Sequence, residues 1–352
     1  MKEQGVMLMK GLKFTGFALA ALLALPALAK AEHKIIDRVK VGDGGFDYAT
    51  FNPATNQVLM ARTDYTTVID VKTHKVSELK NTIRAHSTLP VPGTTLAVLP
   101  QRKGSINDGD KGTIRIVDLA TDTVVADLPG EVNPDSPAYD PFTKYVFVAN
   151  QISAQLSVVD PVAKKIVKTI DVGGKLEFLA SDSAGKVYVN DESIPTTIAV
   201  VDVKALTVSP NRYPLQGCME TTGLAYVPPA KLLVSSCKNG MAKFLDAATG
   251  KEVASIPIAR GPDAVIYDAT RQLVLIPCGI DGILEIISVA DPTKIASVQH
   301  LATEQGSRTG TIDPATGRVY LMASKPDPKG PPAPGAPVPR LAGSFEVLVI
   351  SP

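Results

Sequence analysis

Short runs of alternating hydrophobic and polar residues follow one another along most of the chain, and one stretch shows the pattern completely. Four such runs lie at residues 136–139, 145–150, 155–160 and 165–172. Asp, Asn and Pro separate the runs, and these residue types favour turns. The stretch therefore predicts four short β-strands in succession.

The third of these runs ends in two valines and Asp160, and this ending recurs at regular intervals. An aspartate follows two apolar residues at Asp70, Asp118, Asp160, Asp202 and Asp246, at gaps of 48, 42, 42 and 44 residues. Ser288 and Ser351 take the same position in two further repeats. A period of about forty residues with four strands in each repeat is typical of propeller blades. The repeats predict an all-β, seven-bladed β-propeller with four-stranded blades.

The last repeat has only three strands of its own. We place the blades at residues 46–79, 86–128, 133–172, 175–208, 218–258 and 262–298, with the seventh beginning near residue 308. Residues 35–41 resemble the fourth strand of the third blade. We therefore expect this N-terminal strand to complete the last blade, because such a closure leaves no open sheet edge.

Two segments, VFVANQISAQLSVVDPVAKKIVKTIDVGG and KVYVNDESIPTTIAVVD, resemble YVTN-type repeats. Residues 32–352 as a whole resemble the YncE-like family of seven-bladed β-propellers. This resemblance implies the fold but no particular chemistry, because the family shares no established reaction and propellers host many activities. Some relatives bind DNA, but a net charge of +1 lacks the basic footprint of that function. We expect no DNA partner.

The N-terminal residues differ from the repeats. Lys10 and Lys13 precede an apolar run at residues 14–25, and small residues follow up to Ala29 and Ala31. This order predicts a secretory signal peptide, residues 1–31, that is cut after Ala29 or Ala31. The apolar run is shorter than the roughly 20 residues of a membrane anchor. We expect residues 32–352 to form one propeller domain, periplasmic or secreted, without a transmembrane span.

The chain has three cysteines, and export favours their oxidation. Cys218 precedes the first strand of the fifth blade and Cys237 follows its second strand, so antiparallel pairing would bring the two together. We predict a disulfide between Cys218 and Cys237. The alternative pairing joins Cys237 to Cys278, and three free thiols are the other possible outcome.

Polar side chains are expected to converge at one end of the central channel, where the innermost strands start and the loops after the second strands return. The aligned blades place Asp47, His86, Asp135, Glu177, Thr222, Asp263 and Arg308 at the strand starts, and Arg62, Asp64, Asn150, Asn190 and Asp191 in the loops. Ionisable groups that share one concavity need a ligand, a metal or a counter-charge. These positions predict a polar, acidic channel mouth that binds a small molecule, a peptide or a protein.

Two other interpretations of these residues stay open. Aspartates at strand starts often bond to nearby backbone amides, and Arg308 or His86 would neutralise them without a ligand. Oxygen ligands from Asp135, Glu177 and Asp263 would suit Ca²⁺, and a bound ion could polarise a carbonyl in a lactonase-like hydrolase. The sequence has no legible Ser-His-Asp arrangement and no haem, zinc-protease or P-loop motif. We favour a non-catalytic binding or scaffold protein without an organic cofactor, with the metal-dependent hydrolase as the alternative.

Residues 325–340 are rich in proline and interrupt the last blade between its second and third strands. This composition favours polyproline II structure or disorder over a strand. The segment is either a flap or docking segment near the channel mouth, or a surface insertion, which loops accept at little thermodynamic cost.

Overall fold

The computed structural model describes residue 1 and residues 32–104, 109–330 and 339–352. Within these residues the chain forms 29 β-strands and no helix, so none of the described segments is a helix suited to crossing a membrane. The strands belong to one unit, Glu32–Pro352. The expected signal peptide lies outside the described residues except for Met1, and its cleavage stays a prediction.

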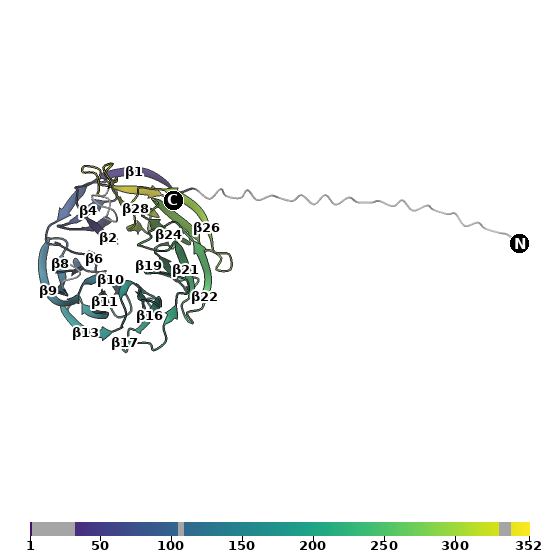
Figure 1. Ribbon diagram of the computed structural model, residues 1–352, viewed down its shortest axis with the longest axis horizontal. Coiled ribbons are helices and arrows are strands. Elements are labelled where there is room, and N and C mark those ends of the chain that lie inside the picture. The colour runs from purple at the N-terminus through teal and green to yellow at the C-terminus, as the bar shows by residue number, and fades with distance from the viewer. Residues whose placement is uncertain (2–31, 105–108, 331–338) are drawn as a thin grey trace. The chain divides into compact units, whose positions relative to one another are not determined.

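Seven antiparallel sheets surround a central axis, one for each repeat of the sequence (Figure 1). Blade 1 contains β2 (Phe46–Asn52), β3 (Gln57–Arg62), β4 (Thr66–Asp70) and β5 (Val76–Leu79). Blade 2 contains β6 (Leu89–Pro90), β7 (Leu96–Gln101), β8 (Lys111–Asp118) and β9 (Thr123–Val132). Blade 3 contains β10 (Pro134–Asp140), β11 (Tyr145–Asn150), β12 (Gln155–Asp160) and β13 (Lys165–Asp171).

The remaining blades follow in chain order. Blade 4 contains β14 (Leu176–Ser181), β15 (Lys186–Asp191), β16 (Thr197–Asp202) and two short outer strands, β17 (Thr207–Val208) and β18 (Tyr213–Pro214). Blade 5 contains β19 (Thr221–Val227), β20 (Leu232–Cys237), β21 (Met241–Asp246) and β22 (Glu252–Pro257). Blade 6 contains β23 (Ile266–Asp268), β24 (Leu273–Cys278), β25 (Ile283–Ser288) and β26 (Ala296–Ala302). Blade 7 contains β27 (Gly310–Asp313), β28 (Arg318–Ala323), β29 (Glu346–Ser351) and β1 (Lys34–Lys40).

The N-terminal strand closes the ring, as predicted. β1 pairs antiparallel with β29, from Lys34 opposite Ser351 to Lys40 opposite Glu346. The strand order β1-β29-β28-β27 makes β1 the outermost strand of blade 7 (Figure 1). Arg38 of β1 also forms an ion pair with Glu346. Both edges of β29 are therefore paired, which removes a template for aggregation.

The recurring aspartates build the turn between the third and fourth strands of their blades. Asp160 Oδ1 accepts hydrogen bonds from the backbone N–H groups of Val162 and Ala163, at 3.1 and 2.8 Å, and Lys164 then takes a φ of 55°. The same bonds form at Asp70, Asp118, Asp202 and Asp246, and the residue four positions later again has a positive φ. The sequence repeat is therefore a repeated turn held by a carboxylate.

Apolar side chains fill the spaces between neighbouring blades. Phe147 and Leu156 of blade 3, for example, are fully buried with Leu176 and Val187 of blade 4. Comparable clusters join blades 4 to 5, 5 to 6, 6 to 7, 7 to 1 and 2 to 3. Truncation of a buried Phe to Ala typically costs about 3–5 kcal/mol. These interfaces therefore fix the positions of the blades, and with them the positions of the side chains around the axis.

Three outer strands differ from their expected bounds. β17 and β18 both pair with β16, but residues 209–212 between them belong to no strand. The Ser209 N–H still donates to the carbonyl of Val200, whereas Pro210 has no N–H to donate. β9 and β26 continue to Val132 and Ala302, beyond the expected blade ends at residues 128 and 298. The three inner strands of each blade hold the predicted order.

The predicted disulfide between Cys218 and Cys237 is present, with Cα atoms 5.4 Å apart. Cys237 ends β20 and lies opposite Thr221 of β19, so the segment just before β19 reaches it. Cys278, the alternative partner, is a free and fully buried thiol in blade 6. The bond is consistent with a location outside the cytoplasm, because disulfides persist in oxidising compartments.

Candidate functional site

A β-bulge lies at the start of the innermost strand in four blades. In blade 1, Asp47 and Tyr48 together lie opposite a single residue of β3. Asp135 of β10, Glu177 of β14 and Thr222 of β19 occupy the same place in the bulges of their own blades. Bulges often re-aim a side chain next to a functional site. In these four blades, the residue that the sequence alignment places at the channel mouth lies in the bulge.

In the other three blades the equivalent residue lies just before the innermost strand. His86, Asp263 and Arg308 precede β6, β23 and β27 by two or three residues. Isolated bridges at Ala85 and Pro262 still hold two of these segments beside the second strands of their blades. The first residues of all seven blades therefore lie at the same end of the ring.

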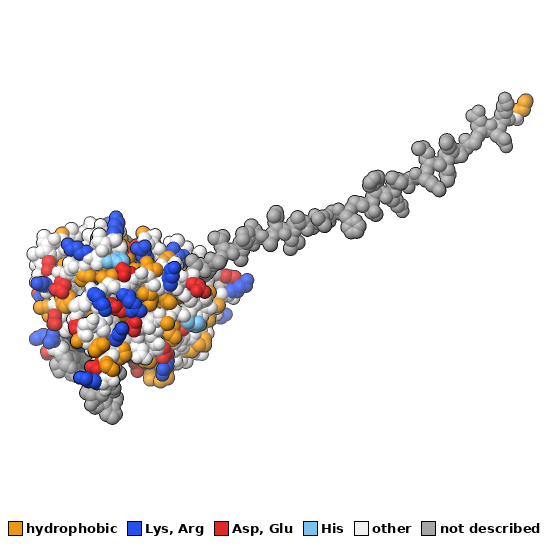
Figure 2. Space-filling model, turned by 90° about the horizontal axis from the view of Figure 1, so that it is seen from above, with side chains coloured by type: hydrophobic (Ala, Val, Ile, Leu, Met, Phe, Trp, Pro, Cys, Tyr) orange, Lys and Arg blue, Asp and Glu red, His pale blue; other side chains and the backbone are white. Residues whose placement is uncertain are grey.

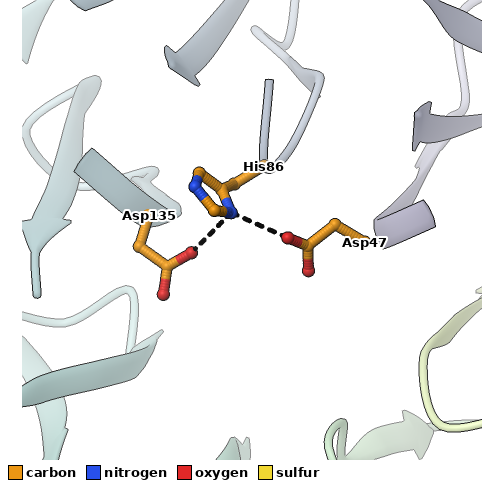
Figure 3. A group of neighbouring side chains, drawn as sticks. All are labelled: Asp47, His86 and Asp135. Atoms are coloured by element: carbon orange, nitrogen blue, oxygen red, sulfur yellow. Dashed lines mark hydrogen bonds and ion pairs between the residues drawn. The ribbon is translucent and has the colours of Figure 1, made fainter. Parts of the chain in front are cut away.

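His86 joins two of the expected carboxylates in one cluster (Figure 3). Its Nδ1 atom lies 2.7 Å from Asp47 Oδ2 and 3.1 Å from Asp135 Oδ1. The three residues come from blades 1, 2 and 3, so the cluster forms only in the folded ring. The Nε2 atom of His86 is buried, and no hydrogen-bond partner for it is found among the described residues.

The two carboxylates keep the imidazole charged. Burial alone lowers the pKa of His86, but Asp135 and Asp47 outweigh this effect and raise the pKa to about 9. Burial raises the pKa of Asp135 to about 7, helped by Asp47 and Asp263 and opposed by His86. At neutral pH the protonated, positively charged form of His86 is therefore favoured between the side chains of Asp47 and Asp135.

A second ion pair joins blades 6 and 7 at the same end of the channel. Arg308 Nε donates to Asp263 Oδ2 at 2.7 Å, and the guanidinium lies over the ring of Phe46, 5.1 Å from its centroid. Burial raises the pKa of Asp263 despite the nearby Arg308, and Asp47 adds to the increase. His86 and Arg308 thus supply the counter-charge that the carboxylates were expected to need.

Glu177 is held by neutral donors instead of a cation. Tyr48 Oη donates to its Oε1 at 3.0 Å, and Gln151 Nε2 donates to its Oε2 at 2.7 Å. Burial raises the pKa of Glu177 well above its ordinary value, and the nearby Asp135 and Asp263 add to the shift. Burial and the neighbouring carboxyls thus both disfavour the charged form of Glu177.

The carboxylates of the mouth do not cap local turns. Among the described residues, no backbone N–H group donates to the side chain of Asp47, Asp135 or Asp263, in contrast to the repeated bonds at Asp160. Their partners are side chains from other blades. This arrangement separates the mouth aspartates physically from the turn aspartates, although the residue type is the same.

Three expected loop residues serve the blades themselves. Arg62 is 1% exposed and donates to the backbone carbonyls of Gly42, Gly44 and Gly45. Asn150 bonds within blade 3 and to the backbone N–H of Glu131. Asn190 donates to the carbonyls of Thr222 and Gly223 in the next blade.

The other expected positions are also engaged locally or exposed. Asp191 pairs with Arg212 at 2.8 Å, Thr222 bonds to Ser236, and Asp64 lies on the surface. The structure therefore brings together six of the predicted residues, which are Asp47, His86, Asp135, Glu177, Asp263 and Arg308.

Two residues of the hydrogen-bond network around Glu177, Gln151 and Glu192, were not among the positions expected from the sequence. Gln151 and Glu192 directly follow the expected Asn150 and Asp191, and Gln151 bonds to both Glu177 and Glu192. Lys175 lies 2.8 Å from Glu192 and extends this network towards the surface. The polar residues of these loops could have indicated such a network. Which of them points towards the channel, however, is decided by the loop conformation, which the sequence pattern does not specify.

Two cavities open at this end of the channel and share Arg308. The first, of about 600 Å³, adjoins the His86 cluster, and the second, of about 870 Å³, lies beside Asp263 and the described end of the proline-rich segment. Their ionisable lining residues are Asp47, Arg62, Arg84, His86, Arg102, Lys238, Asp263, Arg308 and Arg340. Basic side chains therefore surround the acidic layer that the sequence predicts.

Only one group of described residues has the composition and spacing of a metal site. Three possible ligand atoms, one from each of Asp47, His86 and Asp135, lie within 4.8 Å of one another. One imidazole and two carboxylates suit a transition metal better than Ca²⁺, which prefers oxygen ligands. Of the set proposed for Ca²⁺, Asp263 is paired with Arg308, and Glu177 is bonded to Tyr48 and Gln151.

Comparisons with known proteins show the fold. No protein-family model matches the chain, and no curated protein matches its sequence. A structure of hydrazine synthase from Kuenenia stuttgartiensis is similar with a TM-score of 0.68 and 14% identity, over 81% of this chain and 94% of that chain. A chain in a structure of the mitotic checkpoint complex has a TM-score of 0.67 and 13% identity, over 97% and 98%. These similarities support the seven-bladed β-propeller fold, while membership of the YVTN-repeat family stays a prediction.

Proposed function

We propose that this chain is an exported binding or scaffold protein, and that its partner is a peptide or a protein that docks at the channel mouth. The observation that carries this proposal is the distribution of exposed apolar side chains. Ile152, Ile194 and Ile280 lie two or three residues beyond the ends of second strands. Ile83 and Met219 lie shortly before innermost strands, so all five residues lie at the mouth end. Ile194 is 85% exposed.

The opposite end of the ring is poorer in such residues. Among the described turns there, Phe142 and Val162 are the exposed large apolar side chains, and Phe142 is partly covered by Lys204. We infer that the exposed aliphatic side chains at the mouth supply the apolar part of a docking surface for another protein. The rigid blades would present this surface in one conformation, which lowers the entropic cost of binding.

A peptide library tests the proposal. Peptides enriched on the immobilised protein are measured by fluorescence anisotropy against two surface variants, Ile194→Ser at the mouth and Val162→Ser at the opposite end. We expect the mouth variant to weaken binding several-fold and the control to bind like the wild type. Peptides that lose affinity only for Val162→Ser would place the docking surface at the other end.

A second candidate function is a metal-dependent hydrolase. The close approach of Asp47, His86 and Asp135 favours it, because a bound ion there could polarise a carbonyl. His86 would have to be neutral to bind a metal, so binding would release its proton. Metal analysis of the purified protein, with a melting curve before and after a chelator, distinguishes the two. One equivalent of metal whose removal lowers the Tm would favour the hydrolase.

A further inference from the structure

Arginines without an acidic partner gather at the channel mouth. The chain has 11 arginines, of which Arg38, Arg115, Arg212, Arg260, Arg271 and Arg308 form ion pairs with carboxylates. For the other five no carboxylate partner is found among the described residues. Four of those five line the two mouth cavities, namely Arg62, Arg84, Arg102 and Arg340.

The face of the molecule drawn in Figure 2 shows no such imbalance. On the face seen in Figure 2, Lys and Arg side chains lie interspersed with Asp and Glu side chains. At the mouth, seven basic residues line the cavities against two carboxylates, Asp47 and Asp263. Those two carboxylates already face His86 and Arg308. Lys238 is paired with Glu192 and Glu220, so the excess positive charge belongs to the four arginines without an acidic partner.

Guanidinium N–H groups that have no partner among the described residues lie beside one of the two mouth cavities. Arg102 is exposed and makes no hydrogen bond to any described residue, and Arg84 donates only to the carbonyl of Gly104, at 3.3 Å. Arg308 uses Nε for Asp263 and Nη2 for the carbonyl of Phe46, which leaves Nη1 available. These groups line the cavity beside His86.

Neighbouring cations also act on one another here. Arg102 opposes the increase in the pKa of His86, and burial together with Arg308 lowers the pKa of Arg340. Repulsion of this kind is relieved when an anion binds. Guanidinium groups bind carboxylates and phosphates through paired hydrogen bonds, whereas a cation would be repelled.

We propose that the cavity lined by Arg84, Arg102 and Arg308 is an anion site, which holds a carboxylate or phosphate group of the ligand above the layer formed by His86 and Asp47. The ligand's hydrogen-bond donors would then face Asp47. This inference deepens the proposed function, since it names the charged group that a docking partner or small molecule would insert.

Two probes test the anion site without knowledge of the natural ligand. Inorganic phosphate and succinate are titrated separately into the protein by calorimetry at low ionic strength, since salt screens exposed charges. We expect saturable binding of at least one probe, with one site per chain. A response to phosphate alone or to succinate alone identifies the anionic group.

Arg102→Gln is the test variant, because Arg102 is exposed and has no partner whose loss would unfold the protein. Arg260→Gln is the matched control, since Arg260 lies at the same end of the ring but is paired with Asp281 at 2.7 Å, outside both cavities. We expect Arg102→Gln to weaken binding about tenfold or more and Arg260→Gln to leave it unchanged.

Two results would overturn the anion site. One is the absence of saturable binding of either probe to the wild type. The other is an equal loss of affinity in Arg102→Gln and Arg260→Gln, which would indicate general charge attraction. Anion binding without any peptide docking would refute only the proposed peptide or protein partner, so the two failures are distinguishable.

Discussion

The Nδ1 atom of His86 lies 2.7 Å from Oδ2 of Asp47 and ties the start of blade 2 to the bulge of blade 1. The same nitrogen lies 3.1 Å from Asp135 of blade 3. Three blades thus meet through one imidazole at the mouth of the channel. These ion pairs join residues that lie far apart in the sequence. Folding therefore creates the charge cluster, and the cluster in turn stabilises the contact between the three blades.

Stability should fall as the pH rises from about 6.5 to about 9. The pKa of His86 is raised in the folded state, so its contribution is fully present below the unfolded value of 6.5 and is lost as the pH rises through about 9. The shift in the pKa of His86 corresponds to roughly 3 kcal/mol of stability. Urea denaturation at the two pH values measures the change. His86→Gln should reduce it, whereas an equal change in both proteins would assign the dependence to other groups.

Removal of one carboxylate should shift the titration of His86. The Asp135→Asn variant keeps the shape of the side chain but removes a charge that raises the pKa of His86, so this pKa should fall below about 9. The imidazole proton signals report it directly in an NMR titration. Asp118→Asn, at an exposed turn, is the control and should leave the His86 titration unchanged. An unaltered pKa in Asp135→Asn would disprove the contact.

Reduction of the Cys218–Cys237 bond should destabilise the protein. The bond closes a loop with a sequence separation of 19 residues, for which chain entropy predicts roughly 3 kcal/mol. Urea denaturation with and without a reductant measures the difference. The Cys278→Ala variant should show the same difference, because the Cys278 thiol is free. An unfolding free energy that did not respond to reductant would contradict a structural role for the bond.

Deletion of the N-terminal strand should open the ring. A chain that begins at Glu32 serves as reference, and a second chain lacks residues 34–41. Loss of β1 exposes the edge of β29 and removes the ion pair between Arg38 and Glu346. We expect a much lower Tm and aggregation, measured by thermal melting and light scattering. Equal melting of the two chains would show that β1 does not stabilise the propeller.

The fold could be predicted because its repeats carry a local chemical signature. Asp160 and its equivalents recur because each carboxylate holds the same turn, whatever the rest of the blade contains. The pairing of β1 with β29 followed from the resemblance of residues 35–41 to another fourth strand. The disulfide followed from two cysteines that flank one antiparallel strand pair. Each of these inferences needed only relations within a blade or between equivalent blades.

The candidate site was less predictable, because it depends on contacts between blades. The strand-start positions could be aligned, but Arg62 and Asn190 bond to the backbone instead of joining the cluster. Arg102 and Arg340 reach the mouth from irregular segments, where no periodic pattern specifies the path of the chain. Arg62, His86 and Arg308 were expected at the mouth, but nothing in the sequence indicated that Arg102 and Arg340 join them there.

NMR signals of histidine side chains offer the most direct test of the claim that the channel mouth binds a partner. The chain has only four histidines, and His74 and His300 lie away from the mouth, in the β4–β5 turn and in β26. A peptide enriched on the protein is titrated while these signals are followed. We expect a saturable shift of the His86 signal, with the His74 and His300 signals unchanged. A shift of His74 or His300 without any change at His86 would contradict it.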